Sequence, residues 1–275
     1  MMAGLVPEKW ENERRASENG LTETLNIAVA GKGGVGKTTV AALVIRALRN
    51  RKDGSVLAVD ADPNSTLAEA LGMEVEQTLG AIREEVLTLK NALPPGMGKQ
   101  QWVELKSHQC LVEGTGFDLL VMGRTEGPGC YCYVNNLLRG FMSDLTPNYR
   151  YTVLDNEAGM EHLSRRTTRK VDLLMIVTDG SKGSLKAAER IAALVDELEV
   201  EVASLGLVLN RGSRPPDPSP ADLAVLGSVP ADPAVQEAEA QGRSLLDLSE
   251  DTAGPSAVKE IVDRALQARR DAEAT

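Results

Sequence analysis

Short apolar runs of strand length recur along the chain, and longer segments with apolar residues three and four positions apart lie between them. The runs are Leu25–Ala30, Val56–Val59, Phe117–Met122, Tyr151–Leu154, Leu173–Val177, Ala203–Leu209 and Ala224–Val229. The helix-like segments are Thr38–Arg51, Glu161–Lys170 and Ser184–Glu199. Strands that alternate with helices predict an α/β fold with a single doubly wound, mostly parallel sheet covered on both faces.

The pattern is less regular between residues 67 and 116, where helix-like pieces surround Leu93-Pro94-Pro95-Gly96 and strand signals are few. We interpret this stretch as an irregular helical insertion within one domain that spans residues 23–275. Residues 1–22 are polar and lack the apolar centre of a signal peptide, so we expect them to form a mobile tail.

A glycine-rich segment follows the first apolar run and precedes the first helix-like segment. Its sequence, G-K-G-G-V-G-K-T-T, begins at Gly31 and satisfies the P-loop pattern G-x-x-x-x-G-K-[ST] in the context that the pattern needs. Glycines let backbone N–H groups point at phosphate oxygens, and the helix N-terminus adds its positive dipole. We therefore expect nucleotide contacts from Gly33, Gly34, Val35, Gly36, Lys37, Thr38 and Thr39. Lys37 suits the β- and γ-phosphates, and the Thr38 hydroxyl suits Mg²⁺.

Composition narrows the range of partners and compartments. Of the 275 residues 42% are hydrophobic and 3% aromatic, so Ala, Val, Leu and Ile must build the core. The net charge of −10 at pH 7 argues against a general nucleic-acid or anionic-membrane binder, since phosphate affinity comes from clustered Lys and Arg. No apolar stretch reaches the roughly 20 residues of a membrane span. We expect a cytoplasmic protein.

Acidic residues end two more of the predicted strands. The second run leads into Asp60-Ala61-Asp62-Pro63-Asn64, and the run Tyr151–Leu154 leads into Asp155. Carboxylates at the carboxyl ends of parallel strands can face a bound nucleotide. Asp155 has the position of a Walker B acid, which holds Mg²⁺ through water. Asp-Pro is also a common turn, so the Asp60 segment has a plain structural alternative.

Two of the three cysteines stand close together. Cys130 and Cys132 follow the run Phe117–Met122, whereas Cys110 lies apart and is treated as structural. Two thiolates from one chain cannot complete a four-coordinate site, but a symmetric dimer could supply four sulfurs. Four thiolates suit Zn²⁺ and could hold Ni²⁺ or an iron–sulfur cluster. Burial of both cysteines as small core residues is the structural alternative.

Lys32 directly follows the first glycine, which distinguishes this loop from an ordinary P-loop. In this respect the chain resembles the MinD/ParA family of deviant P-loop ATPases, which also includes nitrogenase iron protein. The resemblance implies that Lys32 contacts phosphate on the nucleotide of the opposite subunit, and therefore that ATP drives formation of a homodimer. It also implies that Asp62 positions the attacking water, that Asp60 supports the Mg²⁺ region, and that hydrolysis of ATP is slow. Lys32, Lys37 and Asp62 are thus the candidate catalytic residues.

Two later segments resemble the part of that family's site that holds adenine. Asn210 follows the strand-like Leu207-Val208-Leu209, and its amide can both donate to and accept from the adenine edge. The loop that contains Val229, Pro230 and Ala231 resembles the segment whose backbone also meets the base.

The deviant P-loop, Cys130-x-Cys132 and the segment from Asp155 to His162 together resemble the CooC-type ATPases, which assist nickel insertion into carbon monoxide dehydrogenase. The resemblance extends from about Leu25 to Leu248. It implies that Cys130 and Cys132 bind metal, Ni²⁺ or Zn²⁺, at the dimer interface. It also implies a nickel-enzyme client, carbon monoxide dehydrogenase in particular.

Two other functions could use the same nucleotide site. A positioning ATPase of the MinD or ParA kind would bind membrane or DNA, but residues 256–268 carry acids and lack the aromatic anchors of a membrane-surface helix. We therefore expect no nucleic-acid partner and no stable membrane association. An iron–sulfur electron-transfer ATPase would resemble nitrogenase iron protein, whose two cysteines per subunit are well separated, unlike Cys130-x-Cys132.

Overall fold

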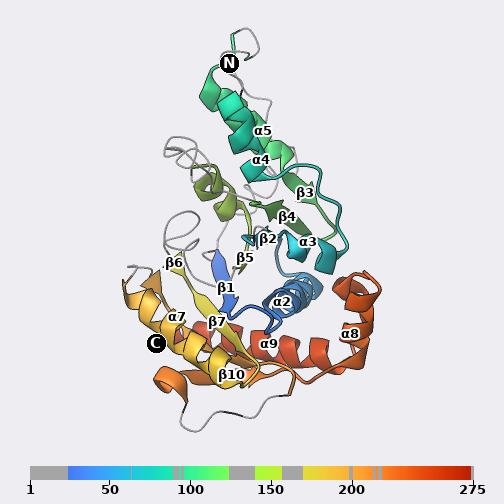
Figure 1. Cartoon of the computed structure of the whole chain (residues 1–275), viewed down its shortest axis with the longest axis vertical. Coiled ribbons are helices and arrows are strands. Elements are labelled where there is room, and N and C mark those ends of the chain that lie inside the picture. Colours follow the sequence, from blue (N-terminus) through green and yellow to red (C-terminus); the bar gives the residue numbers. More distant parts are fainter. Residues whose placement is uncertain are drawn as a thin grey trace.

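A mostly parallel sheet forms the centre of the protein (Figure 1). The computed structural model describes residues 24–62, 64–88, 93, 96–123, 140–156, 170–197, 201–212, 215 and 219–273. Within these residues eight strands follow the order β10-β9-β7-β1-β5-β2-β4-β3, and every pairing is parallel except that of β3 with β4. The strands are β1 (Leu25–Gly31), β2 (Val56–Asp60), β3 (Leu111–Glu113), β4 (Phe117–Val121), β5 (Tyr151–Asp155), β7 (Leu173–Thr178), β9 (Leu205–Leu209) and β10 (Ala224–Ser228). The predicted fold class is confirmed.

Helices cover the two faces of this sheet. They include α2 (Lys37–Arg51), α3 (Thr66–Leu71), α4 (Leu79–Thr88), α5 (Lys99–Gln109), α7 (Lys182–Glu197), α8 (Pro233–Ala240) and α9 (Ala253–Glu273). Short 3₁₀ helices lie at Thr146–Asn148, Pro220–Asp222 and Leu245–Asp247. Alternate residues of β1 divide between the faces: Ile27 and Val29 join the core beneath α2 and α9, whereas Ala28 and Ala30 join the core beneath α7.

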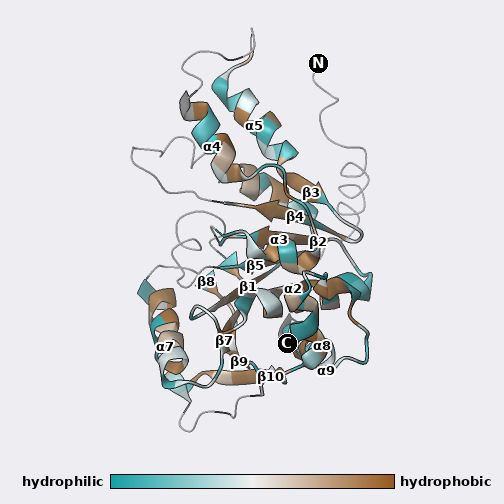
Figure 2. Ribbon diagram, turned by 45° about the vertical axis from the view of Figure 1, so that its right-hand side comes forward, coloured by the Kyte–Doolittle hydropathy of each residue, from teal (hydrophilic) through white to brown (hydrophobic). Residues whose placement is uncertain are grey.

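The central strands are buried along their whole length, as β1, β2, β5 and β7 show. A strand that is covered on both faces needs apolar residues at successive positions, so it appears in the sequence as a continuous apolar run. The hydropathy colouring in Figure 2 accordingly concentrates hydrophobic residues on the strands between the helical layers. No helix among the described residues combines the length and apolar composition that crossing a bilayer requires.

The stretch predicted as an irregular insertion contains α3, α4, α5 and the short strand β3. Figure 1 shows α4 and α5 beyond the β3 end of the sheet, far from α7 and α9. Trp102 of α5, only 6% exposed, joins the core on that side. The strand β3 is absent from the predicted strands because it has three residues, too few to establish an alternating pattern. Whether residues 67–116 form an insertion in a single domain stays a prediction.

The structure differs from the prediction at two points, one before β7 and one between α7 and β9. The strand expected from Ala203 begins at Leu205, and Lys170, expected at the end of a helix, belongs to the strand β6 (Lys170–Val171). A further strand, β8 (Glu201–Val202), pairs with β6 in a small separate sheet. The backbone N–H of Ala203 donates to Val171 O (2.9 Å), whereas Leu174 N donates to Ser204 O (2.8 Å). Hydrogen bonding therefore passes from the β6–β8 pair to the β7–β9 pair at Ala203 and Ser204, so the main-sheet strand begins only at Leu205.

Gly31, at the end of β1, lies where two backbones approach closely. Its φ is +149°, and an ideal Cβ atom there would be 2.4 Å from Val177 O on β7. A side chain at this position would push β1 and β7 apart just before the glycine-rich loop. Gly33 differs, since nothing lies within 4 Å of an ideal Cβ at that position.

Replacing Gly31 by alanine is expected to lower the free energy of unfolding by about 2–4 kcal/mol, because the added methyl group meets a backbone carbonyl in a conformation that alanine disfavours. Urea unfolding without nucleotide measures the effect. Gly33→Ala is the matched control, expected within about 0.5 kcal/mol of wild type. Equal stability of the two variants would contradict this account of the β1–β7 contact.

Cys110 follows α5 and is fully buried, and burial raises the pKa of its thiol to about 12. Since the thiolate is the reactive form, we expect the folded protein to protect Cys110 from iodoacetamide at about pH 8. Peptide mapping by mass spectrometry should show the label at Cys110 only after unfolding in urea. Rapid labelling of Cys110 in the folded protein would contradict its burial.

Candidate nucleotide-binding site

The glycine-rich loop connects β1 to α2 at the carboxyl edge of the sheet. Gly36 precedes α2 with φ 90° and ψ 34°, a left-handed conformation that glycine adopts without strain. Gly33 and Gly34 are exposed, and an ideal Cβ atom on either would have open space around it. Lys37 is 8% exposed, and its Nζ lies 3.5 Å from Lys32 O. The loop thus presents open backbone beside a lysine that is held over it, as phosphate binding requires.

Asn210, which follows β9, ties this loop to the sheet. Its Nδ2 donates to Val35 O (2.7 Å), and its Oδ1 accepts from Arg211 N (2.9 Å). An ideal Cβ on Gly36 would be 2.3 Å from Nδ2, so a residue with a side chain cannot replace that glycine while the contact persists. Asn210 therefore positions the loop, a role that the sequence did not predict; its contact with adenine stays a prediction.

A cavity of about 150 Å³ lies beside the first turn of α2. Its lining includes Gly36, Thr39, Asn210 and the loop residues Val229, Pro230 and Ala231. The structure thus brings the residues predicted for the adenine end together with the start of the P-loop helix.

Two buried carboxylates, Asp60 and Asp155, end the neighbouring strands β2 and β5 and are register partners in the sheet. The carboxylate of Asp60 is bonded to backbone. Its Oδ1 accepts from Asp62 N (3.0 Å) and its Oδ2 from Leu67 N (2.9 Å), so it holds the loop after β2 and the first turn of α3. Burial raises the pKa of Asp60 to about 6, and those backbone hydrogen bonds act in the opposite direction.

Asp155 is 1% exposed, and neither of its carboxylate oxygens has a hydrogen-bond partner within the described part of the chain. Burial raises its pKa to about 7 and the charge of Asp60 adds to the shift, whereas the nearby Thr38 hydroxyl and Lys37 ammonium oppose it. A buried carboxylate with both oxygens unpaired, next to a threonine hydroxyl, is a hard-oxygen donor set that fits Mg²⁺. Thr38 Oγ1 also lies 3.3 Å from Thr66 Oγ1.

Asp62 follows Asp60 by two residues at the carboxyl edge of the sheet and is half-buried. Its Oδ1 accepts from the backbone N (2.8 Å) and the Nδ2 (2.9 Å) of Asn64. Its negative charge contributes to the raised pKa values of both Asp60 and Asp155, which indicates that the three acids act on one another. The structure therefore gathers all three predicted acids around the end of the P-loop.

Lys32 is exposed on the outer side of the loop. Its Nζ lies 2.9 Å from the position of an ideal Cβ on Gly183, in the first turn of α7. The ammonium group thus rests above α7 of its own chain, and its predicted contact with a second subunit stays a prediction.

The predicted metal ligands Cys130 and Cys132 lie outside the described residues. Within the described ranges, no group of three or more His, Cys, Asp or Glu side chains is arranged to hold a metal ion. The Cys-x-Cys site therefore stays a prediction.

The contacts of three residues at the site were not predicted from the sequence, although Asp232 belongs to the loop predicted to meet the adenine. Thr66 contacts Thr38, and Glu239 of α8 accepts a hydrogen bond from Thr39 Oγ1. Asp232 borders the small cavity, and its carboxylate binds Ala234 N (2.9 Å) and Gly254 N (2.6 Å), so that it joins the starts of α8 and α9. Only Asp232 carries a local signal, an acid before a proline at the first helical position.

Known proteins share both this sequence and this fold. Residues 26–246 match the CobQ/CobB/MinD/ParA nucleotide binding domain. An uncharacterised ATP-binding protein of Methanocaldococcus jannaschii is 44% identical over 247 residues, which cover 86% of this chain and 97% of that protein. The carbon monoxide dehydrogenase accessory protein CooC of Rhodospirillum rubrum is 32% identical over 247 residues, covering 82% of this chain and 90% of that protein.

A solved structure of the septum site-determining protein MinD of Pyrococcus horikoshii, complexed with Mg-ADP, has a TM-score of 0.65 to this chain at 21% identity. The structural alignment covers 90% of this chain and 98% of the MinD chain, so the two proteins share one fold. The match over residues 26–246, together with the P-loop geometry, shows that the chain belongs to the CobQ/CobB/MinD/ParA family of nucleotide-binding proteins.

Proposed function

We propose that this protein is an ATP-dependent metallochaperone, which forms a dimer around a metal ion and assists nickel insertion into a client enzyme, carbon monoxide dehydrogenase in particular. The proposal of nucleotide binding rests on one observation: the Asp155 carboxylate is buried beside Thr38 and the P-loop, and neither of its oxygens has a hydrogen-bond partner within the described residues. The metal part is supported by Cys130 and Cys132 and by the 32% identity to CooC.

ATP is the nucleotide we assign to the loop, in keeping with the ATP-binding relative at 44% identity. Backbone N–H groups from Gly33 to Thr39 would surround the phosphates, with Lys37 between the β- and γ-phosphates. Thr38 and Asp155, with Asp60 behind them, would hold Mg²⁺, which when bound neutralises charge that develops on the phosphates.

The reaction we assign is slow hydrolysis of ATP to ADP and phosphate. Phosphoryl transfer of this kind depends on positioning and on charge neutralisation, so no covalent nucleophile from the protein is needed. Asp62 would orient the attacking water from the end of β2, and Lys37 and Lys32 would offset the charge of the leaving phosphates. The adenine would lie in the cavity bordered by Asn210 and Val229–Ala231.

Dimerisation connects the nucleotide to the metal. Lys32 is exposed at the edge of the site, so it can leave its position over Gly183 and reach a nucleotide held by a second subunit. Two subunits joined in this way would bring together two Cys130–Cys132 pairs, and four thiolates complete a tetrahedral site for Zn²⁺ or a site for Ni²⁺. Nucleotide state would then control metal capture and release.

Metal titration of the reduced protein with ATP and Mg²⁺ tests the proposal. Wild type is expected to bind about one Ni²⁺ or Zn²⁺ per two subunits, since four thiolates complete one site. The double variant Cys130→Ser/Cys132→Ser should lose this binding, whereas Cys110→Ala, which removes a buried thiol elsewhere, should keep it. Unchanged affinity in the double variant would refute the metal site.

Lys32→Ala is expected to abolish ATP-dependent dimerisation while ATP binding by the single subunit falls less than about tenfold, because Lys32 would act on the partner's nucleotide and not on its own. Sedimentation velocity with a non-hydrolysable ATP analogue measures the mass. Lys186→Ala removes an exposed lysine one turn into α7 and serves as the control. A dimer that persists in Lys32→Ala would exclude the proposed crossing.

A further inference from the structure

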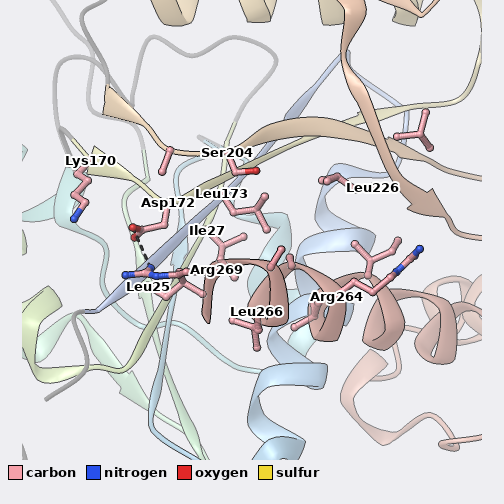
Figure 3. A pocket seen from close by; sticks show the side chains of 16 residues that line it. Leu25, Ile27, Lys170, Asp172, Leu173, Ser204, Leu226, Arg264, Leu266 and Arg269 are labelled. Carbon is pink, nitrogen blue, oxygen red and sulfur yellow. Dashed lines mark ion pairs between the residues drawn. The ribbon is translucent and has the colours of Figure 1, made fainter. Parts of the chain in front are cut away.

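A second and larger cavity, of about 730 Å³, lies at the other end of the sheet from the nucleotide site (Figure 3). It opens between the C-terminal half of α9 and the amino ends of the central strands. Leu25 and Ile27 of β1 and Leu173 of β7 line it, whereas the opposite end of β1 leads into the P-loop. The cavity therefore belongs to no part of the machinery described above.

The wall of this cavity is aliphatic. Eleven of its lining residues are apolar, and none of the lining residues is aromatic: Leu25, Ile27, Leu173, Ala203, Val225, Leu226, Ile261, Val262, Ala265, Leu266 and Ala268. Its volume lies within the range of small-molecule sites, roughly 300–1,000 Å³. Without an aromatic face for stacking, the wall suits a flexible alkyl chain better than a planar ring.

Charged side chains stand at its two ends, as Figure 3 shows. At one end Arg269 Nη1 lies 3.0 Å from Asp172 Oδ1, and Asn26 N donates to Asp172 Oδ2 (2.8 Å), so the negative charge there is already balanced. At the other end Arg264 is exposed and directs its Nη2 over Gly227, 2.9 Å from the position of an ideal Cβ. Its Nε donates to the backbone oxygen of Glu260 (3.3 Å). Because a backbone oxygen carries no net charge, this contact does not neutralise the guanidinium.

The balance of charge favours an anion. Lys170, Arg264 and Arg269 line the cavity with one acid, Asp172, in a protein whose net charge is −10. Gly227 allows this arrangement, since an ideal Cβ there would lie 2.5 Å from Ile261 Cγ1 and would force α9 away from β10. A ligand with an apolar body and one negative end matches both the wall and the rim.

We infer that this cavity binds a single-chain aliphatic carboxylate, with its alkyl chain along β1 and α9 and its carboxylate at Arg264. Burial of the chain supplies most of the affinity, and a charge-assisted hydrogen bond from the guanidinium fixes the orientation. The Asp172–Arg269 pair lines the far end, where the arginine is already engaged by the carboxylate.

Isothermal titration of the full chain with dodecanoate, below its micelle concentration, tests the inference. Saturable binding of about one ligand per chain is expected, and octanoate should bind more weakly because it buries fewer CH₂ groups. Arg264→Gln should weaken dodecanoate binding roughly tenfold through loss of the charge-assisted bond. Arg270→Gln is the matched control, since Arg270 is exposed on the same helix and does not line the cavity.

A second variant tests the cavity itself. Ala265→Phe should fill part of the space and weaken binding at least about tenfold through lost chain contacts, while the urea midpoint confirms that the variant is folded. Lys37→Ala should lose nucleotide and keep dodecanoate, so failure here is distinguishable from failure of the proposed function. Absence of saturable binding, or equal affinity in wild type, Arg264→Gln and Ala265→Phe, would overturn the inference.

Discussion

Two carboxylates buried side by side, Asp60 and Asp155, set the constraint around which the nucleotide end of the protein is organised. They are register partners on β2 and β5 and are almost fully buried. Such a pair is costly unless its charge is compensated. The chain compensates Asp60 internally with backbone N–H groups from the loop after β2 and from α3. Asp155 has no such backbone partner within the described residues, and the Thr38 hydroxyl and the Lys37 ammonium are the nearby groups that favour its charged form.

Residues at this edge of the sheet are therefore of two kinds, those that hold the structure together and those that are available to a ligand. Asp60 and Asn210 hold loops in place with their side chains, whereas the Asp155 carboxylate and the backbone of the exposed glycines make no such contact and are available to a ligand. The opposite edge has a different character, with an aliphatic cavity and a cationic rim. Because β1 and β7 run between the two edges, ligands at both ends would act on the same buried strands.

Much of this arrangement is predictable from local sequence. Buried parallel strands appear as apolar runs, so β1 and β7 were located within one residue, and the P-loop was recognisable from its glycines and its position between a strand and a helix. Contacts between distant segments were not predictable. Asn210 meets Val35 across 175 positions and Thr39 meets Glu239 across 200, and no spacing in the sequence encodes such tertiary neighbours. The three-residue β3 was missed because it is too short to form a pattern.

The proposed binding of ATP with Mg²⁺ depends most on the availability of the Asp155 carboxylate to the cation. Calorimetric titration of ATP with and without Mg²⁺, in wild type and in Asp155→Asn, tests this most directly. In wild type Mg²⁺ is expected to strengthen ATP binding at least about tenfold, and the nearly isosteric Asn variant should lose most of that gain because its amide supplies no charge. An Asp155→Asn protein that folds normally and keeps the full Mg²⁺-dependent gain would contradict the account.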